Sequence, residues 1–142
     1  MGASADVVGR KIEAFNGHDA AGILAAYGAD CVEEAPGTTL HGSGEVVAYF
    51  SVFWDAFPDL RFTLERLVEE GASVAVFGRC TGVHRGPLRA PGGDVAPTGR
   101  GLDLPVSTFY DIRDGRIASA RLTFDQATLL GQLGLMPAPA SA

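Results

Sequence analysis

The chain has 142 residues, of which 46% are hydrophobic and 20% charged, and its formal net charge is −6. These values are typical of one globular domain with a sizeable core, and the negative balance argues against nucleic-acid binding, which needs clustered cations. The sequence contains no apolar run long enough to span a membrane and no basic, apolar leader at its start. We therefore expect no membrane contact and a cytoplasmic location.

Two helices and a short strand are predicted in the first third of the chain. Apolar residues at helical spacing predict a first helix that Ser4 can cap, and Asp19 can cap a short second helix. Residues 31–35 are typical of a strand, and residues 38–44 are predicted to form a polar loop.

A third predicted helix follows Ser43 and is strongly aromatic. Too much of its circumference is apolar for a single stripe, which predicts contact with a sheet and with a second surface. These rings fit either a plain core with a dimer contact or the wall of a ligand pocket. They are Tyr49, Phe50, Phe53, Trp54 and Phe57.

Two strands are predicted next, at residues 60–68 and 73–84. The second has Gly78 and Gly82 on one face, which predicts a strongly curved sheet with its concave side cleared of side chains. Residues 85–103 contain five glycines and three prolines, and we expect this segment to gate a pocket.

A hairpin and a last helix end the predicted fold. Asp114-Gly115 separates two β-rich runs, at residues 106–112 and 116–124, and Asp-Gly is a strong signal for a two-residue turn. Asp125 can then cap a helix that Gly134 ends. Helices, a run of strands and a final helix indicate an α+β fold.

Three segments give the chain a family resemblance: NGHDAAGILAAYGADCV, TGVHRG…PTGR and DGRI…FDQATLLGQLGL. Together they resemble the SnoaL-like polyketide cyclases of the nuclear-transport-factor-2-like superfamily. The resemblance implies a cone-shaped, strongly curved, mostly antiparallel sheet wrapped around N-terminal helices over residues 1–136, with a disordered tail at 137–142. It also implies a homodimer through the outer sheet face and an apolar small molecule as substrate or ligand.

The same resemblance, read with the alternation of strand residues, implies an apolar pocket inside the cone. The expected lining residues are Phe15, Ala35, Phe50, Phe53, Trp54, Gly78, Cys80, Tyr110, Ala120, Leu122 and Phe124.

The sequence departs from the ionisable groups of these relatives. The acid/base Asp of the ring cyclases falls at Leu122 and their histidine at Thr108. Ketosteroid isomerase, a relative by fold, has its base at the position of Ala35 and a phenol at the position of Lys11. The chain has one lysine, Lys11, and ten arginines, and we interpret this ratio as an effect of coding composition.

No metal or cofactor signature is present. His18, His41 and His84 share no ligand spacing, and Cys31 and Cys80 form no CxxC pair. The sequence has no P-loop, dinucleotide fingerprint or GxSxG motif. Any chemistry is expected to need no metal and no cofactor.

Three residues are the candidates for proton transfer or hydrogen bonding. Glu33 shares strand parity with Ala35 and could be an acid or base of raised pKa, or the exposed end of an edge strand. His84 could shuttle protons or bind the adjoining loop at the rim, and Thr108 could orient a carbonyl or sit in the core. Asp125 is assigned to capping.

The sequence thus predicts a cofactor-independent cyclase or isomerase of a polyketide-like or other apolar small molecule. With an Asp absent at Leu122, we expect catalysis to depend mainly on folding the substrate. The alternative is a non-catalytic domain for small-molecule binding or dimerisation.

Overall fold

The fold is described for residues 2–136 in a computed structural model, and the predicted tail at 137–142 lies outside these residues. Helices and strands follow one another in runs, with four consecutive strands between α3 and α4, which confirms the α+β class. In order, the elements are α1 (Ala3–Asn16), α2 (Ala20–Ala26), β1 (Tyr27–Ala35), β2 (Thr38–His41), α3 (Ser43–Ala56), β3 (Arg61–Glu70), β4 (Ser73–Val83), β5 (Gly101–Arg113), β6 (Arg116–Thr123) and α4 (Gln126–Gln132).

The strands form one open, mixed sheet in the order β2-β1-β6-β5-β4-β3. Neighbouring strands are antiparallel except β1 and β6, which are parallel. The predicted hairpin, β5–β6, lies at the centre of this order. Its turn residues Asp114 and Gly115 have φ angles of 53° and 72°, the left-handed values that a two-residue turn of type I′ requires.

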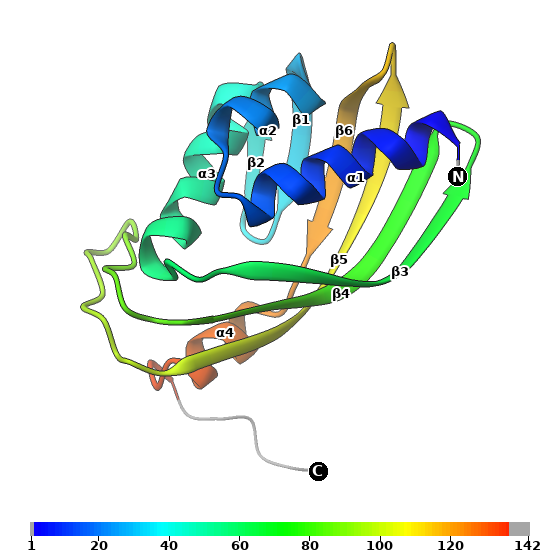
Figure 1. The fold of residues 1–142 in the computed structure, drawn as a ribbon. Coiled ribbons are helices and arrows are strands. Elements are labelled where there is room, and N and C mark those ends of the chain that lie inside the picture. Colours follow the sequence, from blue (N-terminus) through cyan, green and yellow to red (C-terminus); the bar gives the residue numbers. More distant parts are fainter. Residues whose placement is uncertain (1, 137–142) are drawn as a thin grey trace.

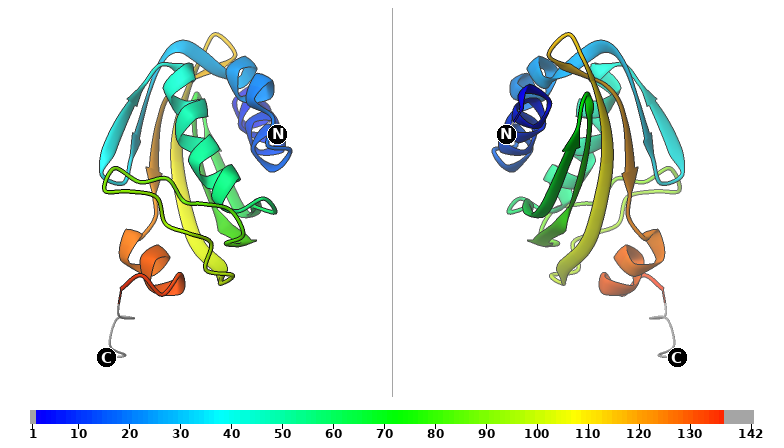
Figure 2. Two further views of the ribbon diagram at one scale, coloured as in Figure 1. Left: turned by 90° about the vertical axis from the view of Figure 1, so that its left-hand side faces the viewer. Right: turned by 90° about the vertical axis from the view of Figure 1, so that its right-hand side faces the viewer.

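The sheet is strongly bent, and α1 lies across its concave side (Figure 1). Helices α1 and α3 are on the same side of the sheet, so the bend partly encloses the space between them and the strands (Figure 2). Helix α1 contacts β3, β4, β5 and β6, whereas α3 packs on β1 and β2 and α4 on β5. Among the described residues, no helix is both long and apolar enough to cross a membrane.

Alternation along β5 determines which side chains face the helices. Every second residue from Leu102 to Tyr110 is buried, and the residues between them are exposed, as expected for a strand covered on one face. The opposite, outer face of the sheet exposes large apolar side chains, namely Val68, Phe77 and Phe109.

The prediction of a polar loop at residues 38–44 is partly wrong, because residues 38–41 form strand β2. They pair antiparallel with the end of β1, from Ala35 opposite Thr38 to Val32 opposite His41. Gly37, at φ 80°, allows the tight turn between the two strands. This pairing satisfies backbone groups of β1 that the sequence alone left without partners.

The start of α1 also differs from the prediction that Ser4 caps it. Gly2 is the N-cap and supplies no side chain. Instead, the Glu69 carboxylate of β3 accepts hydrogen bonds from the backbone N–H groups of Gly2 and Ala5. A carboxylate at this position also interacts favourably with the positive end of the helix dipole.

The loop between β4 and β5 is held against the end of α3. The N–H groups of Arg85 and Gly86 donate to the Ala56 carbonyl, and the Leu88 side chain is buried in the core. Arg89 forms an ion pair with Asp55 at 2.5 Å. These contacts attach the loop to α3 and give no support to its predicted role as a gate.

Candidate ligand-binding cavity

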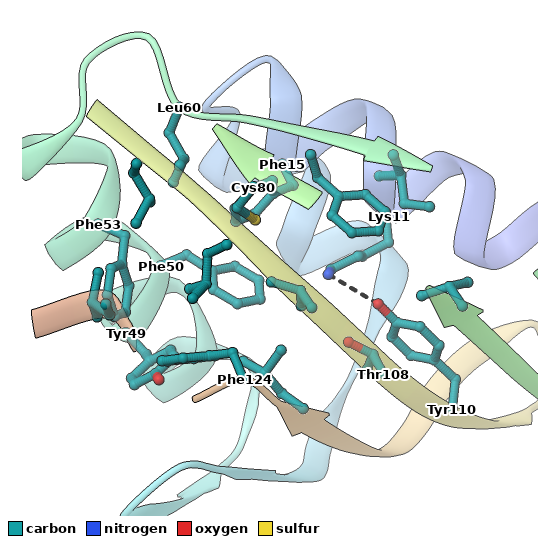
Figure 3. A pocket seen from close by; sticks show the side chains of 18 residues that line it. Lys11, Phe15, Tyr49, Phe50, Phe53, Leu60, Cys80, Thr108, Tyr110 and Phe124 are labelled. Carbon is teal, nitrogen blue, oxygen red and sulfur yellow. Dashed lines mark hydrogen bonds between the residues drawn. The ribbon is translucent and has the colours of Figure 1, made fainter. Parts of the chain in front are cut away.

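A cavity opens between α1, α3 and the concave face of the sheet (Figure 3). The centres of water-sized molecules can occupy about 70 Å³ of it, several times the space that one water needs. Most of its wall is apolar, formed by Ile12, Phe15, Phe50, Phe53, Leu60, Phe62, Val76, Leu102, Leu104, Val106, Leu122, Phe124 and Leu129.

The polar groups gather mainly at one end of this cavity. Lys11 from α1 and Thr108 and Tyr110 from β5 lie together there, whereas the Tyr49 phenol lies at the other end (Figure 3). Lys11 Nζ donates a hydrogen bond to the Tyr110 phenol oxygen at 3.0 Å. Among the described residues, no carboxylate lines the cavity.

Aromatic rings surround the Lys11 ammonium. Nζ lies 5.3 Å from the ring centroid of Phe15, 5.0 Å from that of Phe50 and 5.5 Å from that of Tyr110. Each distance is within the range of a cation–π attraction. The rings therefore stabilise a cation in a place that water reaches poorly.

A second buried pair involves Glu33, which does not line the cavity. The Tyr27 hydroxyl donates to Glu33 Oε1 at 2.6 Å, and each of these residues is only 1% exposed. Both belong to β1, the strand next to β6 in the sheet.

The charges of Lys11 and Glu33 influence each other. Burial disfavours the Lys11 ammonium, but the nearby Tyr110 oxygen and Glu33 carboxylate outweigh this effect, so the pKa of Lys11 is raised. Burial raises the pKa of Glu33, and the Lys11 charge and the Tyr27 hydrogen bond offset this only in part. Lys11 is therefore a protonated ammonium at neutral pH.

The cysteine in the cavity is a poor nucleophile. Burial raises the pKa of Cys80 to about 11, although the charge of Lys11 acts in the opposite direction. At neutral pH the side chain is a thiol, and the thiolate is the reactive form.

The cavity brings together most of the residues expected to line it: Phe15, Phe50, Phe53, Cys80, Tyr110, Leu122 and Phe124. Thr108, expected to form hydrogen bonds, also lines it. The alternation of side chains along β4, β5 and β6 accounts for the positions of Cys80, Thr108, Tyr110 and Leu122.

Four expected lining residues lie elsewhere, namely Ala35, Trp54, Gly78 and Ala120. Trp54 packs instead on the Phe15 and His18 rings. Gly78 is covered because the Phe62 ring and the Thr63 carbonyl occupy the space where a Cβ would lie. The expected clear concave side is thus filled at this point by a neighbouring strand. Ala35 ends β1 at the β2 turn, and Ala120 is buried against β5.

His84 lies outside the cavity as well. Its ring packs on Phe57, and Nδ1 is within hydrogen-bond distance of the Thr98 hydroxyl and backbone N–H. Burial lowers its pKa. Its contacts connect the end of β4 to the following loop, so it is not placed to act on a molecule in the cavity.

Comparison with known proteins identifies the family. Residues 8–120 match the model of the SnoaL-like domain. The chain belongs to the SnoaL-like domain family. No curated protein has a sequence significantly similar to it.

Solved structures with the same fold include several SnoaL-like and NTF2-like proteins. A candidate SnoaL-like polyketide cyclase from Jannaschia sp. CCS1 has a TM-score of 0.83 at 22% identity, covering 95% of this chain and 94% of its own. IdmH, a candidate polyketide cyclase from Streptomyces antibioticus, has a TM-score of 0.76 at 27% identity, covering 92% and 98%. An NTF2-like protein from Burkholderia pseudomallei K96243 has a TM-score of 0.74 at 23% identity, covering 94% and 98%. The domain match confirms the family expected from the sequence, and these structures confirm the fold.

Within this SnoaL-like domain, sequence reasoning missed Lys11 as a cavity residue. By resemblance, Lys11 stands at the position of a phenol of ketosteroid isomerase and receives no predicted role, yet its side chain lies at the polar end of the cavity. A signal was present: Lys11 precedes Phe15 by four residues, which places both on one face of α1. A lone lysine on the apolar face of a helix is the pattern that could have revealed it.

Proposed function

We propose that this SnoaL-like domain is a cofactor-independent cyclase or isomerase of an apolar, polyketide-like small molecule. The observation that supports this best is an apolar cavity with its hydrogen-bond donors concentrated at one end. Such a cavity can hold a flexible chain in a folded conformation, with one of its carbonyl oxygens directed at Lys11 and Tyr110. Orientation of this kind can contribute several kcal/mol to catalysis.

The family's acid/base Asp falls at Leu122 by resemblance, and Leu122 is an apolar part of the cavity wall. The proposed chemistry therefore depends on substrate folding and on polarisation of a carbonyl by Lys11 and Tyr110. Donors aimed at an oxygen on which negative charge develops stabilise a transition state strongly in a water-poor site. Thr108 supplies a further hydroxyl for orienting the substrate.

Glu33 enters the proposal as a positioning residue, because it acts through Lys11. It raises the pKa of Lys11 and so keeps the ammonium protonated. In Glu33→Gln we expect the pKa of Lys11 to fall, so that the loss of turnover at alkaline pH moves to lower pH. If Glu33 instead transfers protons itself, turnover falls on the order of 10²-fold at every pH while ligand affinity is retained.

The test is ring formation in a panel of linear β-polyketones, followed by liquid chromatography and mass spectrometry. We expect a cyclised product with the wild-type protein and its loss in Val106→Phe, which fills the cavity wall. Arg113→Phe is the matched control, since it adds the same ring at an exposed position of β5.

The non-catalytic binding domain remains the second candidate, because an apolar cavity is also what a carrier needs. Members of the panel that bind the folded protein without being converted would favour this alternative and would refute the proposed cyclase or isomerase.

A further inference from the structure

We propose that the polar end of the cavity binds its ligand as an oxyanion, the ionised form of a weakly acidic enol or phenol, on Lys11 and Tyr110. This inference rests on the proposed function and specifies its substrate class: an apolar molecule with one enolisable or phenolic oxygen.

The first argument is the unfilled hydrogen-bonding capacity at this end. An ammonium has three N–H donors, and in the described part of the chain Lys11 uses one of them, on Tyr110. The Tyr110 hydroxyl accepts that bond, and its own O–H has no acceptor among residues 2–136. Donors from both residues can therefore converge on one ligand oxygen in the cavity.

The second argument is the charge. Lys11 is the only cationic residue that lines the cavity within the described residues, and the rest of the wall is apolar apart from hydroxyls and one thiol. An anion that enters an apolar wall loses its hydration, so it binds only beside a compensating cation. Lys11 supplies that cation at the same end as the free donors.

The third argument concerns how acidic the ligand is. The Glu33 carboxylate lies near enough to raise the pKa of Lys11, and a second permanently ionised carboxylate at this place would be repelled by it. A weakly acidic oxygen can enter the apolar cavity protonated, without losing the hydration of a charge, and ionise only beside Lys11. In that step its O–H bond breaks, the electron pair stays on the ligand oxygen, and the proton passes to the buffer.

The test uses 2-naphthol as the probe, with its ionisation followed by absorbance during a pH titration. Bound to the wild-type protein, we expect its pKa to fall by about 1 or more below the free value. Bound to Lys11→Met, we expect its pKa to rise above the free value, because the cavity is then apolar without a cation. A change of sign between the two proteins is the expected result.

Arg10→Met is the matched control, since it removes one positive charge from the adjoining residue of α1, which is exposed. Its bound probe should titrate as in the wild-type protein. If Lys11→Met does not fold, Tyr110→Phe replaces it, and the fall in the probe's pKa should become smaller because one donor is lost. An unchanged pKa of the bound probe in Lys11→Met, or in Tyr110→Phe when that variant replaces it, would overturn the proposal.

A second arm uses 2-naphthoate, which has the same rings and a permanently ionised carboxylate. We expect it to bind more weakly than 2-naphthol at neutral pH, and tighter binding would overturn the choice of a weak acid. Neither arm requires turnover. If the bound probe does not ionise in a protein that still cyclises the polyketones, the oxyanion site is refuted and the proposed cyclase is not.

Discussion

Replacing Tyr27 by Phe tests the buried Tyr27–Glu33 pair. The substitution keeps the ring and removes a hydroxyl that donates to Glu33 at 2.6 Å. Because both side chains are 1% exposed, water cannot replace the lost partner. Hydrogen bonds to charged groups contribute about 1.5–3 kcal/mol, and we expect Tyr27→Phe to lower the free energy of unfolding by about 2–3 kcal/mol at neutral pH. For a domain of this size, that corresponds to a fall in Tm of about 6–12 °C.

The loss should depend on pH in a defined direction. Burial raises the pKa of Glu33 above its ordinary value of 4.5, and the Tyr27 hydrogen bond lowers it in part, so the substitution raises it further. A carboxyl with a raised folded-state pKa loses stability as pH rises from its unfolded pKa through its folded pKa. That window extends to higher pH in the variant. The deficit should therefore grow with pH, from about 1 kcal/mol in acid, where a neutral bond is lost.

Urea unfolding of both proteins between about pH 5 and pH 8 measures this deficit. Tyr49→Phe is the control, because the Tyr49 hydroxyl has no hydrogen-bond partner among the described residues, and it should change stability by less than about 0.5 kcal/mol. A deficit that is the same at both ends of the pH range would refute an ionised Glu33 in contact with Tyr27.

Three further predictions concern the sheet, the last helix and the assembly. Gly78→Ala should destabilise the protein by about 1–3 kcal/mol in urea unfolding, because its Cβ would meet the Thr63 carbonyl. Gly9→Ala is the control: its Cβ meets nothing within 4 Å, so it should be neutral or stabilising by up to about 1 kcal/mol. Equal effects of the two substitutions would contradict the packing argument. Asp125→Ala should cost about 1 kcal/mol in the same assay, since this side chain accepts from the backbone at the start of α4; no loss would show that α4 does not need its cap. We also propose a homodimer through the outer sheet face, where Phe109 is 52% exposed; light scattering should show a dimer that Phe109→Glu converts to a monomer, and a wild-type monomer would exclude it.

The sequence by itself was sufficient for the order of the helices and strands other than β2, and for the β5–β6 hairpin. Asp114-Gly115 predicted the β5–β6 hairpin, and Asp19 and Asp125 predicted two helix starts that the structure confirms. These signals are local, because turns and caps involve residues a few positions apart in the chain. Strand alternation likewise determined that Thr108 and Tyr110 share a face.

Other features depend on contacts between distant segments, and only the tertiary structure decided them. The Glu69 cap of α1 comes from β3, and strand β2 exists because β1 lies beside it. Gly78 lost its place in the cavity wall because the Phe62 ring from β3 covers it. No local pattern contains such information.

The candidate site shows the same division most clearly. Parity assigned Glu33 to the interior but did not reveal that Tyr27 would donate a hydrogen bond to it or that it would not line the cavity. The sequence did not show that Lys11 would line the cavity. Lys11 became the polar end of the cavity only because α1 crosses the concave face of the sheet and places its ammonium beside Tyr110, 99 residues further along the chain. The sequence determined which side chains were available and which face of each element they occupy, and the packing of α1 on the bent sheet decided which of them meet.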